Sequence, residues 1–223
     1  MPHLLTLSDR TVVIVIAMLK GGSGKTTSAV LTALYYARQG LDVDLLDGDH
    51  TSQSAYDWAR IAAASGTPLP FQVERFPYTN DIAAELRQRR AASPTKKRII
   101  VDAGGGDAMY LEEAASEADI LISTLAPSAA DARRVDATLK AAERGAERNP
   151  RGLLTTMALV RADHRTSQPR RWRNQLKADG RPLLDTSIGA RVLYSDAYGT
   201  CPDDVGEYAP LLAEVETDLV VPA

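Results

Sequence analysis

The sequence predicts a single doubly wound α/β domain, in which helices flank a mostly parallel β-sheet. Short apolar, β-branched runs alternate with longer helical stretches, and this alternation is typical of parallel sheets. The 223 residues have the length of one ordinary domain, which we place at residues 11–223 after an N-terminal arm at residues 1–10. Apolar residues make up 44% and charged residues 25%, close to the averages for globular proteins, so the composition argues against disorder.

Each strand and helix is predicted from a local pattern. Short apolar runs rich in β-branched residues indicate strands, which we place at residues 12–17, 41–46, 71–76, 98–102, 120–125 and 153–160, with a short extended piece at 183–184. Longer stretches indicate helices, which we place at residues 25–39, 54–64, 81–92, 129–144, 168–178, 191–198 and 205–219. Gly40, directly after the first of these helices, is a typical helix end.

The loops after four predicted strands are expected to meet. Ligands of parallel α/β sheets bind beyond the carboxyl ends of the strands. The segments at these ends are residues 20–27, 47–49, 102–106 and 124–127. The sequence therefore predicts that these four loops converge on one site.

The charge and cysteine content exclude several kinds of protein. Asp and Glu exceed Lys and Arg by 29 to 26, and this mild acidity by itself argues against a nucleic-acid partner. Cys201 is the single cysteine, which excludes an intramolecular disulfide framework, a cysteine-based zinc site and an iron–sulfur cluster held within one chain. The longest apolar run, residues 12–19, is far shorter than the roughly 20 residues of a membrane span, so no membrane partner is expected. No signal-peptide pattern surrounds it, and a cytoplasmic location is expected.

Residues 19–27 read L-K-G-G-S-G-K-T-T and lie between a predicted strand and a predicted helix, the context that a phosphate-binding loop requires. Glycines allow backbone N–H groups to turn inward, and these form an anion cradle together with the helix N-terminus. In such a loop Lys25 reaches the β- and γ-phosphates, Thr26 places its hydroxyl on Mg²⁺, and Thr27 contacts the α-phosphate. The remaining cradle residues are Gly21, Gly22, Ser23 and Gly24. The alternative is a glycine turn with solvated lysines, which does not explain the ordered series of strand, glycines, lysine and hydroxyls.

The loop departs from the strict pattern G-x-x-x-x-G-K-[ST], because Leu19 stands at the first glycine position and Lys20 follows it. This deviant Walker A form resembles the ParA/MinD family of P-loop ATPases, and the small plasmid-type ParF branch in particular. The resemblance covers roughly residues 11–217 and is looser after residue 130. It implies ATP hydrolysis with Mg²⁺ and a homodimer in the ATP state. Lys20 would then reach across the interface to the partner's nucleotide and act in catalysis beside Lys25.

Asp47 and Asp49 follow the second predicted strand, and two carboxylates at this spacing suit Mg²⁺ binding and the positioning of water. The resemblance implies that Asp49 is the catalytic residue that orients the attacking water, with Asp47 in the magnesium shell. His50 stands where the family usually has proline, and we interpret it as a polar loop residue. The alternative for the two aspartates is that both cap the predicted helix that begins at residue 54.

Asp102 ends another predicted strand, where a Walker B carboxylate would contact the nucleotide site by holding a water of the Mg²⁺ shell. Gly104, Gly105 and Gly106 follow it, and we interpret them as a loop whose N–H groups sense the γ-phosphate. The family more often has V-D-T-P-P-G here, and the V-D-A-G-G of this chain matches the ParF variant better. The alternative is a structural cap or turn.

The second half of the chain resembles the family less closely. Residues 124–128, T-L-A-P-S, resemble the proline-bearing loop near the nucleotide and the dimer interface. Residues spaced along 188–199 resemble the family's C-terminal segment. Arg161, after a strand end, and Ser187 are the candidates for contacts with the base.

Charge is distributed unevenly along the second half. Residues 161–191 carry eight Lys or Arg against three acids, whereas residues 192–223 carry seven acids and no Lys or Arg. A basic cluster around Trp172 can bind DNA phosphates without reading sequence, and the alternative is a solvated helix face. The candidate DNA-binding residues are Arg165, Arg170, Arg171, Arg173 and Lys177.

These observations lead to the hypothesis of an ATP-dependent DNA-partitioning ATPase of plasmid or chromosome segregation. The resemblance implies that the ATP-bound dimer binds non-specific DNA at the nucleoid. It also implies that a ParB-like centromere-binding protein stimulates hydrolysis and resets the cycle.

Three other functions fit the sequence less well than this hypothesis. A MinD-like membrane-positioning ATPase would need a basic amphipathic C-terminal helix, whereas residues 214–223 are acidic and disfavour it. A metabolic P-loop ligase of the dethiobiotin-synthetase type would need a substrate pocket that the sequence does not identify. A relative of the nitrogenase iron protein would need two cysteines per chain, and this chain has Cys201 alone.

Overall fold

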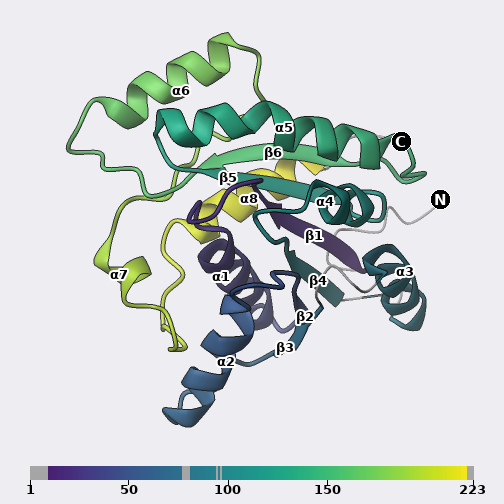
Figure 1. The fold of residues 1–223 in the computed structure, drawn as a ribbon. Helices are drawn as coiled ribbons and strands as arrows, with labels where there is room; N and C mark the ends of the chain where they lie inside the picture. The colour runs from purple at the N-terminus through teal and green to yellow at the C-terminus, as the bar shows by residue number, and fades with distance from the viewer. Residues whose placement is uncertain (1–9, 77–80, 94, 96, 220–223) are drawn as a thin grey trace, which may run out of the picture.

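The computed structural model describes residues 10–76, 81–93, 95 and 97–219 (Figure 1). These residues form a six-stranded sheet with the order β3-β2-β4-β1-β5-β6, in which every neighbouring pair is parallel. The strands are β1 (Val12–Ala17), β2 (Asp42–Asp47), β3 (Gln72–Arg75), β4 (Lys97–Asp102), β5 (Ile120–Leu125) and β6 (Leu154–Leu159). The predicted strands and the doubly wound fold class are confirmed, and the sheet is parallel throughout.

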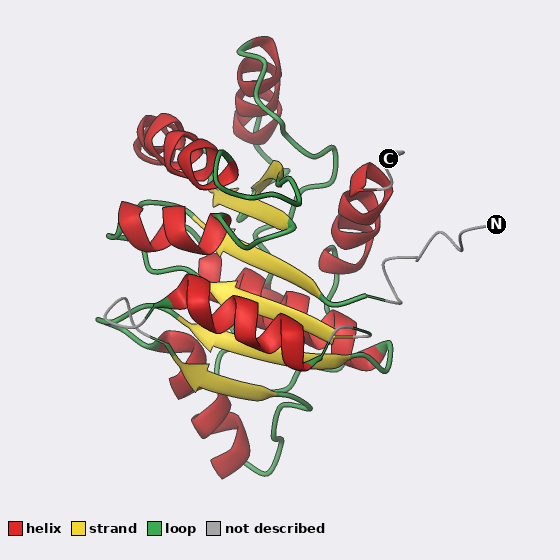
Figure 2. Cartoon of the chain, turned by 90° about the vertical axis from the view of Figure 1, so that its right-hand side faces the viewer, coloured by secondary structure: helices red, strands yellow, loops and turns green. Residues whose placement is uncertain are grey.

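Helices cover both faces of this sheet (Figure 2). They are α1 (Lys25–Arg38), α2 (Ser54–Ala64), α3 (Ile82–Ala92), α4 (Ala108–Ala115), α5 (Ala129–Ala146), α6 (Gln168–Ala178), α7 (Val192–Ser195) and α8 (Tyr208–Leu219). Buried side chains of α1, α2 and α8 share one apolar cluster, and those of α3, α4 and α5 share another on the opposite face. The helix α6 lies beside α5, where Leu176 joins a third cluster with residues of α5 and β6 (Figure 1).

The central strand β1 is buried on both faces. Ile14 and Ile16 belong to the cluster under α1 and α8, whereas Val13 and Val15 belong to the cluster under α4. Side chains alternate between the faces of a strand, so a strand with helices on both sides needs apolar residues at every position. This requirement explains why residues 12–17 form an unbroken apolar run rather than an alternating one.

The register of the sheet brings three strand ends together. Asp47 at the end of β2 pairs with Asp102 at the end of β4, and Asp102 pairs with Ile16 near the end of β1. The chain continues the pairing for one residue beyond the strands, because Gly48 N–H donates to the Asp102 carbonyl over 2.9 Å. The loops after β1, β2 and β4 therefore start at one edge of the sheet.

The structure corrects several predicted helices. The helix α4 was missed: the Asp107 carboxylate accepts the N–H groups of Met109 and Tyr110 and starts a helix directly after the glycine loop. The helix predicted at residues 191–198 is a single turn, closed where the Ser195 hydroxyl donates to the Val192 carbonyl. The last helix begins at Tyr208 rather than at residue 205, because Gly206 has a φ of 55° that a right-handed helix does not accommodate.

Other boundaries differ by smaller amounts. The helix α5 extends two residues beyond the predicted end, to Ala146, and Leu183 of the predicted extended piece makes one isolated bridge with Met157. Residues 1–9 of the predicted N-terminal arm and residues 220–223 of the acidic tail lie outside the described residues. None of the helices in the described ranges combines the length and apolar character of a membrane span.

Candidate nucleotide-binding site

A cavity of about 1130 Å³ opens at the carboxyl edge of the sheet. Its walls come from the phosphate loop, the loops after β2 and β4, and the segment that contains α7. The lining residues include Gly21 to Thr27, Gly48 to Ser52, Gly104 to Asp107, Tyr110, Val160, Arg161 and Ile188 to Val192. Three of the four loops that the sequence predicted to converge thus meet here, whereas Ala126 and Pro127 of the fourth line a smaller neighbouring cavity of about 300 Å³.

The phosphate loop has a backbone that depends on its glycines. Gly22 and Gly24 have φ values of 70° and 85°, in the left-handed region that residues with a β-carbon rarely adopt. A β-carbon on Gly24 would also lie 3.2 Å from the Val160 side chain. The turn at Gly24 leads directly into α1, whose N-terminal residues Lys25 to Thr27 line the cavity. An unsatisfied helix N-terminus at a cavity wall favours an anion, such as a phosphate.

Lys25 carries a positive charge into this wall. Only 7% of Lys25 is exposed to solvent, and its Nζ donates a hydrogen bond to the Lys20 carbonyl over 2.9 Å. Burial lowers the pKa of Lys25, and the nearby carboxylates of Asp102 and Asp49 oppose this effect. A bound phosphate would supply the counter-charge that the buried ammonium needs, as predicted for a phosphate-loop lysine.

Thr26 lines the cavity, and its side chain contacts the buried carboxylate of Asp102 behind the cavity wall. The Thr26 hydroxyl donates to Asp102 Oδ2 over 2.7 Å, and burial raises the pKa of Asp102 to about 7. The negative charges of Asp47 and Asp49 raise it further, and the positive charge of Lys25 offsets them only in part, so a deficit of positive charge remains at this buried carboxylate. A hard divalent cation prefers such oxygen ligands, and its charge would relieve this deficit. The arrangement therefore fits Mg²⁺, which Thr26 and Asp102 would hold.

The two aspartates after β2 make different contacts. Asp47 Oδ1 accepts the N–H of Asp49 over 3.1 Å, and Oδ2 accepts the N–H of Tyr56, in the first turn of α2, over 2.9 Å. Burial raises the pKa of Asp47. Asp49 lines the cavity, and its Oδ1 accepts the N–H groups of Thr51 and Ser52. The capping alternative thus matches the contacts of Asp47, whereas Asp49 stabilises the turn before α2 and faces the cavity. Their predicted roles toward Mg²⁺ and water stay predictions.

The pKa of Asp102 predicts how the stability of the nucleotide-free protein depends on pH. A carboxyl whose pKa rises from 3.8 when unfolded to about 7 when folded binds its proton more tightly in the folded state. Its contribution to stability is therefore present below pH 4 and is lost as the pH rises toward 7, by an amount on the order of 4 kcal/mol. We expect the variant Asp102→Asn to lose less stability between pH 5 and pH 8 than the parent chain. Urea unfolding of both at the two pH values checks this; equal losses would contradict it.

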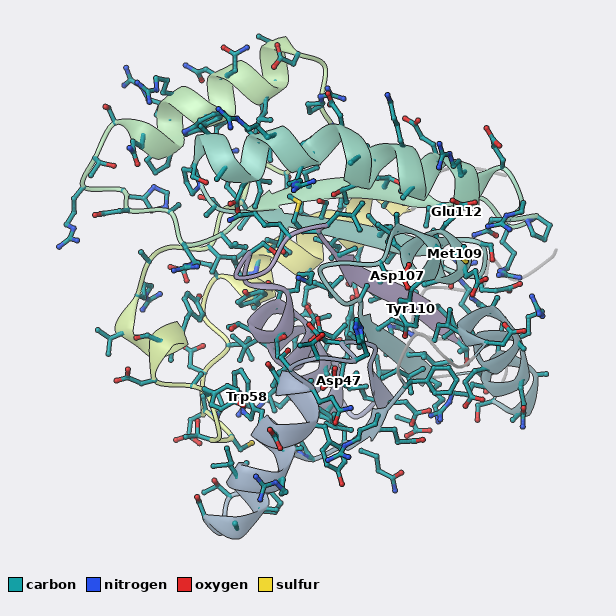
Figure 3. All side chains as sticks on the ribbon, viewed as in Figure 1. Asp47, Trp58, Asp107, Met109, Tyr110 and Glu112 are labelled. Atoms are coloured by element: carbon teal, nitrogen blue, oxygen red, sulfur yellow. The ribbon has the colours of Figure 1, made fainter. Side chains whose placement is uncertain are left out.

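Backbone contacts connect the three loops around the cavity. A β-carbon on Gly105 would lie 2.8 Å from the carbonyl carbon and oxygen of Lys20, so the glycine loop packs directly on the phosphate loop. A β-carbon on Gly48 would overlap the phenol ring of Tyr110, which donates a hydrogen bond to the Phe76 carbonyl over 3.0 Å. Figure 3 labels Tyr110 with its neighbours on α4 and Asp47 at the end of β2. Sequence reasoning missed Tyr110 because it missed α4, although Asp107 after three glycines was a usable helix-start signal.

Lys20 differs from Lys25 in the cavity that it lines. It lines the smaller cavity rather than the larger one, and its ammonium group forms a salt bridge with Asp131 in the first turn of α5. The sequence prediction did not identify Asp131. The usable signal was Ser128, which stands three residues before this acid as in a helix capping box.

Of the two candidates for contacts with the nucleotide base, Arg161 lines the larger cavity and Ser187 does not. Arg161 lines the cavity, has a φ of 56°, and donates to the Gly22 carbonyl over 2.8 Å. Ser187 does not line it and lies 3.4 Å from a ring nitrogen of His164. Tyr208 does line it, with its hydroxyl 2.8 Å from that of Ser28, and was not predicted.

The structure divides the five candidate DNA-binding residues into two groups. Arg165 pairs with Asp163, and Arg173 and Lys177 both lie close to Asp185. By contrast, Arg170 and Arg171 are exposed on α6, and within the described part of the chain no ion pair neutralises them. Two further arginines of the neighbouring helix α5 are also exposed without an ion pair among the described residues. They are Arg133 and Arg134.

Comparisons with known proteins place this geometry in a family. The chain is 24% identical over 193 residues to the maintenance of carboxysome distribution protein A of Halothiobacillus neapolitanus, covering 85% of both chains. It is 30% identical over 120 residues to protein ParA of Rhizobium radiobacter, covering 54% of this chain and 51% of the relative.

Solved structures share the fold at low sequence identity. A putative plasmid partition protein of Borrelia burgdorferi bound to AMPPNP matches with a TM-score of 0.68 at 16% identity, covering 94% of this chain and 99% of that one. Cobyrinic acid a,c-diamide synthase of Mycobacterium smegmatis with bound ADP and magnesium matches with a TM-score of 0.69 at 16% identity, covering 93% and 96%. Residues 14–200 match the family described as the CobQ/CobB/MinD/ParA nucleotide binding domain. The chain therefore belongs to this family of P-loop nucleotide-binding proteins, which includes ParA and MinD.

Proposed function

We propose that this protein is an ATPase that partitions DNA, with Mg-ATP binding that drives dimerisation and non-specific DNA binding. The observation that carries the proposal is the connection between the phosphate loop and the basic surface of α5 and α6, defined as Arg133, Arg134, Arg170 and Arg171. Lys20 and Gly22 share the walls of the smaller cavity with Gln168 and Pro169, the residues directly before Arg170. A nucleotide-dependent change in the phosphate loop thus has a short physical route to this basic surface.

In this proposal the hydrolysis barrier is lowered by positive charge and by the placement of water. Lys25 neutralises the β- and γ-phosphates of its own chain, and Lys20 of each chain neutralises the nucleotide of the other. Mg²⁺, when bound through Thr26 and Asp102, neutralises charge on the phosphate oxygens. Asp49, which faces the cavity, orients the attacking water, and Asp47 holds its loop against α2.

The partners follow from the same cycle. The ATP-bound homodimer binds non-specific DNA through the basic surface and so associates with the nucleoid. A ParB-like centromere-binding protein stimulates hydrolysis, after which the dimer separates and leaves the DNA. Protein ParA of Rhizobium radiobacter, which is 30% identical to this chain over 120 residues, supports this assignment.

Retention of the purified protein on non-specific DNA tests the proposal. We expect retention with ATP and much weaker retention with ADP or without nucleotide, because the dimer doubles the number of arginines that contact one DNA. Retention should fall steeply with salt, since each phosphate contact releases condensed counterions. Equal retention in all three nucleotide states would contradict the proposal.

A second candidate is the positioning of a protein-bounded cargo. The relative that matches 85% of this chain is named for the maintenance of carboxysome distribution. Both candidates use the same nucleotide cycle and differ in the partner that stimulates hydrolysis. Steady-state ATP hydrolysis separates the two candidates. It is measured once with a partner bound to centromere DNA and once with a partner bound to protein cargo, and only the correct partner raises the rate of hydrolysis.

A further inference from the structure

Lys20 and Asp131 form a salt bridge between two segments that are 111 residues apart in the chain. The Asp131 side chain is 1% exposed, whereas the Lys20 side chain is 32% exposed. The carboxylate also accepts the N–H of Ala126 over 2.8 Å and the hydroxyl of Ser128 over 3.1 Å. Asp131 is thus a fixed acceptor at the start of α5, and Lys20 is the movable member of the pair.

The surroundings of Asp131 favour its charged form. Burial alone would raise the pKa of Asp131, but the hydrogen bonds from Lys20, Ala126 and Ser128 outweigh it and leave the pKa below its ordinary value. If the lysine leaves, a buried carboxylate loses its positive partner. Removing one member of a buried charge pair costs more than the pair contributes, because the remaining charge is uncompensated.

The backbone at Lys20 is held independently of this salt bridge. Its N–H donates to the Met18 carbonyl over 2.7 Å, its carbonyl accepts Lys25 Nζ over 2.9 Å, and Gly105 packs against it. The side chain borders the smaller cavity of about 300 Å³, which gives it room to turn away from Asp131. The ammonium group can therefore change partners by side-chain rotation while the phosphate loop keeps its backbone.

We propose that Asp131 is an intrachain latch that holds Lys20 on its own subunit and that must be released before Lys20 can engage a second copy of the chain. This inference rests on the proposed function, in which Lys20 of each chain binds the nucleotide of the other. The latch opposes dimerisation until a bound nucleotide offers phosphate oxygens as a stronger partner.

The size of the effect follows from the number of latches. If the closed latch is favoured about tenfold over the open one, each chain must overcome that factor to dimerise. A dimer opens two latches, so the factor is squared. Removing the latch should then tighten the ATP-dependent dimer by up to about a hundredfold in dissociation constant.

The variant Asp131→Asn tests the latch, because asparagine keeps the shape and the acceptor for Ala126 but has no charge. Sedimentation of the full chain with a non-hydrolysable ATP analogue measures the dimer dissociation constant. We expect a lower constant than for the parent, with unchanged affinity of the monomer for the nucleotide. Asp131→Ser, which also lacks the charge, should shift the constant in the same direction if asparagine impairs folding. Asp136→Asn, at an exposed α5 acid that pairs with Arg181, is the matched control and should change nothing.

The background variant Lys20→Ala identifies the route of the effect. The latch predicts that Asp131→Asn gives no gain in a chain that already lacks Lys20. Two results would overturn the latch and leave the proposed function standing. One is that Asp131→Asn lowers the dimer dissociation constant equally in the chain that carries Lys20→Ala. The other is that Asp131→Asn leaves the constant unchanged, or raises it, in the chain that keeps Lys20. If neither the parent nor the variants dimerise with the ATP analogue at any concentration, the proposed function is wrong and the latch fails with it.

Discussion

Replacing Lys25 with alanine is expected to abolish ATP hydrolysis and to weaken ATP binding by roughly 30- to 1000-fold. The ammonium group lies 2.9 Å from the Lys20 carbonyl in the cavity wall, where charge-assisted hydrogen bonds to phosphate oxygens are strong. The loss of about 2–4 kcal/mol corresponds to roughly 30- to 1000-fold in affinity. Titration with a fluorescent ATP analogue and release of phosphate measure the two effects.

The fold of the Lys25→Ala variant is expected to be unharmed. Burial lowers the pKa of Lys25, which means that the charged form is unfavourable in the nucleotide-free chain. Alanine removes that cost, so the thermal midpoint without nucleotide should be at least that of the parent chain.

Two comparison variants make the Lys25→Ala result specific. Asp49→Asn should keep nucleotide binding and lose most hydrolysis, because it changes the residue proposed to orient water and leaves the phosphate cradle intact. Lys140→Ala, at an exposed lysine of α5, should change neither quantity. Full ATPase activity in the Lys25→Ala variant would show that the site is assigned wrongly.

The double variant Arg170→Glu with Arg171→Glu is expected to weaken ATP-dependent retention on DNA roughly tenfold or more, with nucleotide binding unchanged. Both arginines are exposed on α6 without an ion pair among the described residues, so their charge is available to phosphates. Each lost phosphate contact should also make the slope of log affinity against log salt shallower by about 0.9. A filter or biolayer assay at several salt concentrations measures both the affinity and the slope.

A matched control separates this basic surface from net charge. Arg60→Glu with Arg87→Glu makes the same change in total charge at exposed arginines of α2 and α3, on the other half of the sheet. This control should retain most DNA binding. Equal weakening in both double variants would indicate an effect of net charge alone, and unchanged retention in the α6 variant would remove Arg170 and Arg171 from the mechanism.

The phosphate loop illustrates what could be predicted from sequence. Glycines, Lys25 and Thr26 lie within a few residues of one another, between an unbroken apolar run and a helix, and these local patterns constrain the backbone directly. The parallel sheet was predictable for the same reason, since a strand that is buried on both faces needs apolar residues at every position. The helix α4 and the short length of α7 were not, because a single capping side chain decides where α4 begins and where α7 ends.

The side-chain pairings around the site were beyond the reach of local patterns. Asp131 was overlooked as a partner of Lys20, and nothing in the spacing of the acids showed that Asp47 would bond to the first turn of α2. Likewise, the five candidate DNA-binding residues look alike in sequence. In the folded chain Asp163 pairs with Arg165, and Asp185 lies close to Arg173 and Lys177. Of the five, only Arg170 and Arg171 keep a charge that is available to DNA phosphates.

The sequence by itself determined the fold class, the phosphate loop and the order of the acidic loops, because each depends on residues close together in the chain. Only the tertiary structure decided which charges meet. Thr26 and Asp102 are 76 residues apart, and Lys20 and Asp131 are 111 apart, yet the parallel strands end at one edge and place each pair in contact. Ionic contacts act over a few ångströms of space, whatever the separation along the chain. The fold therefore decides which charged side chains pair with each other.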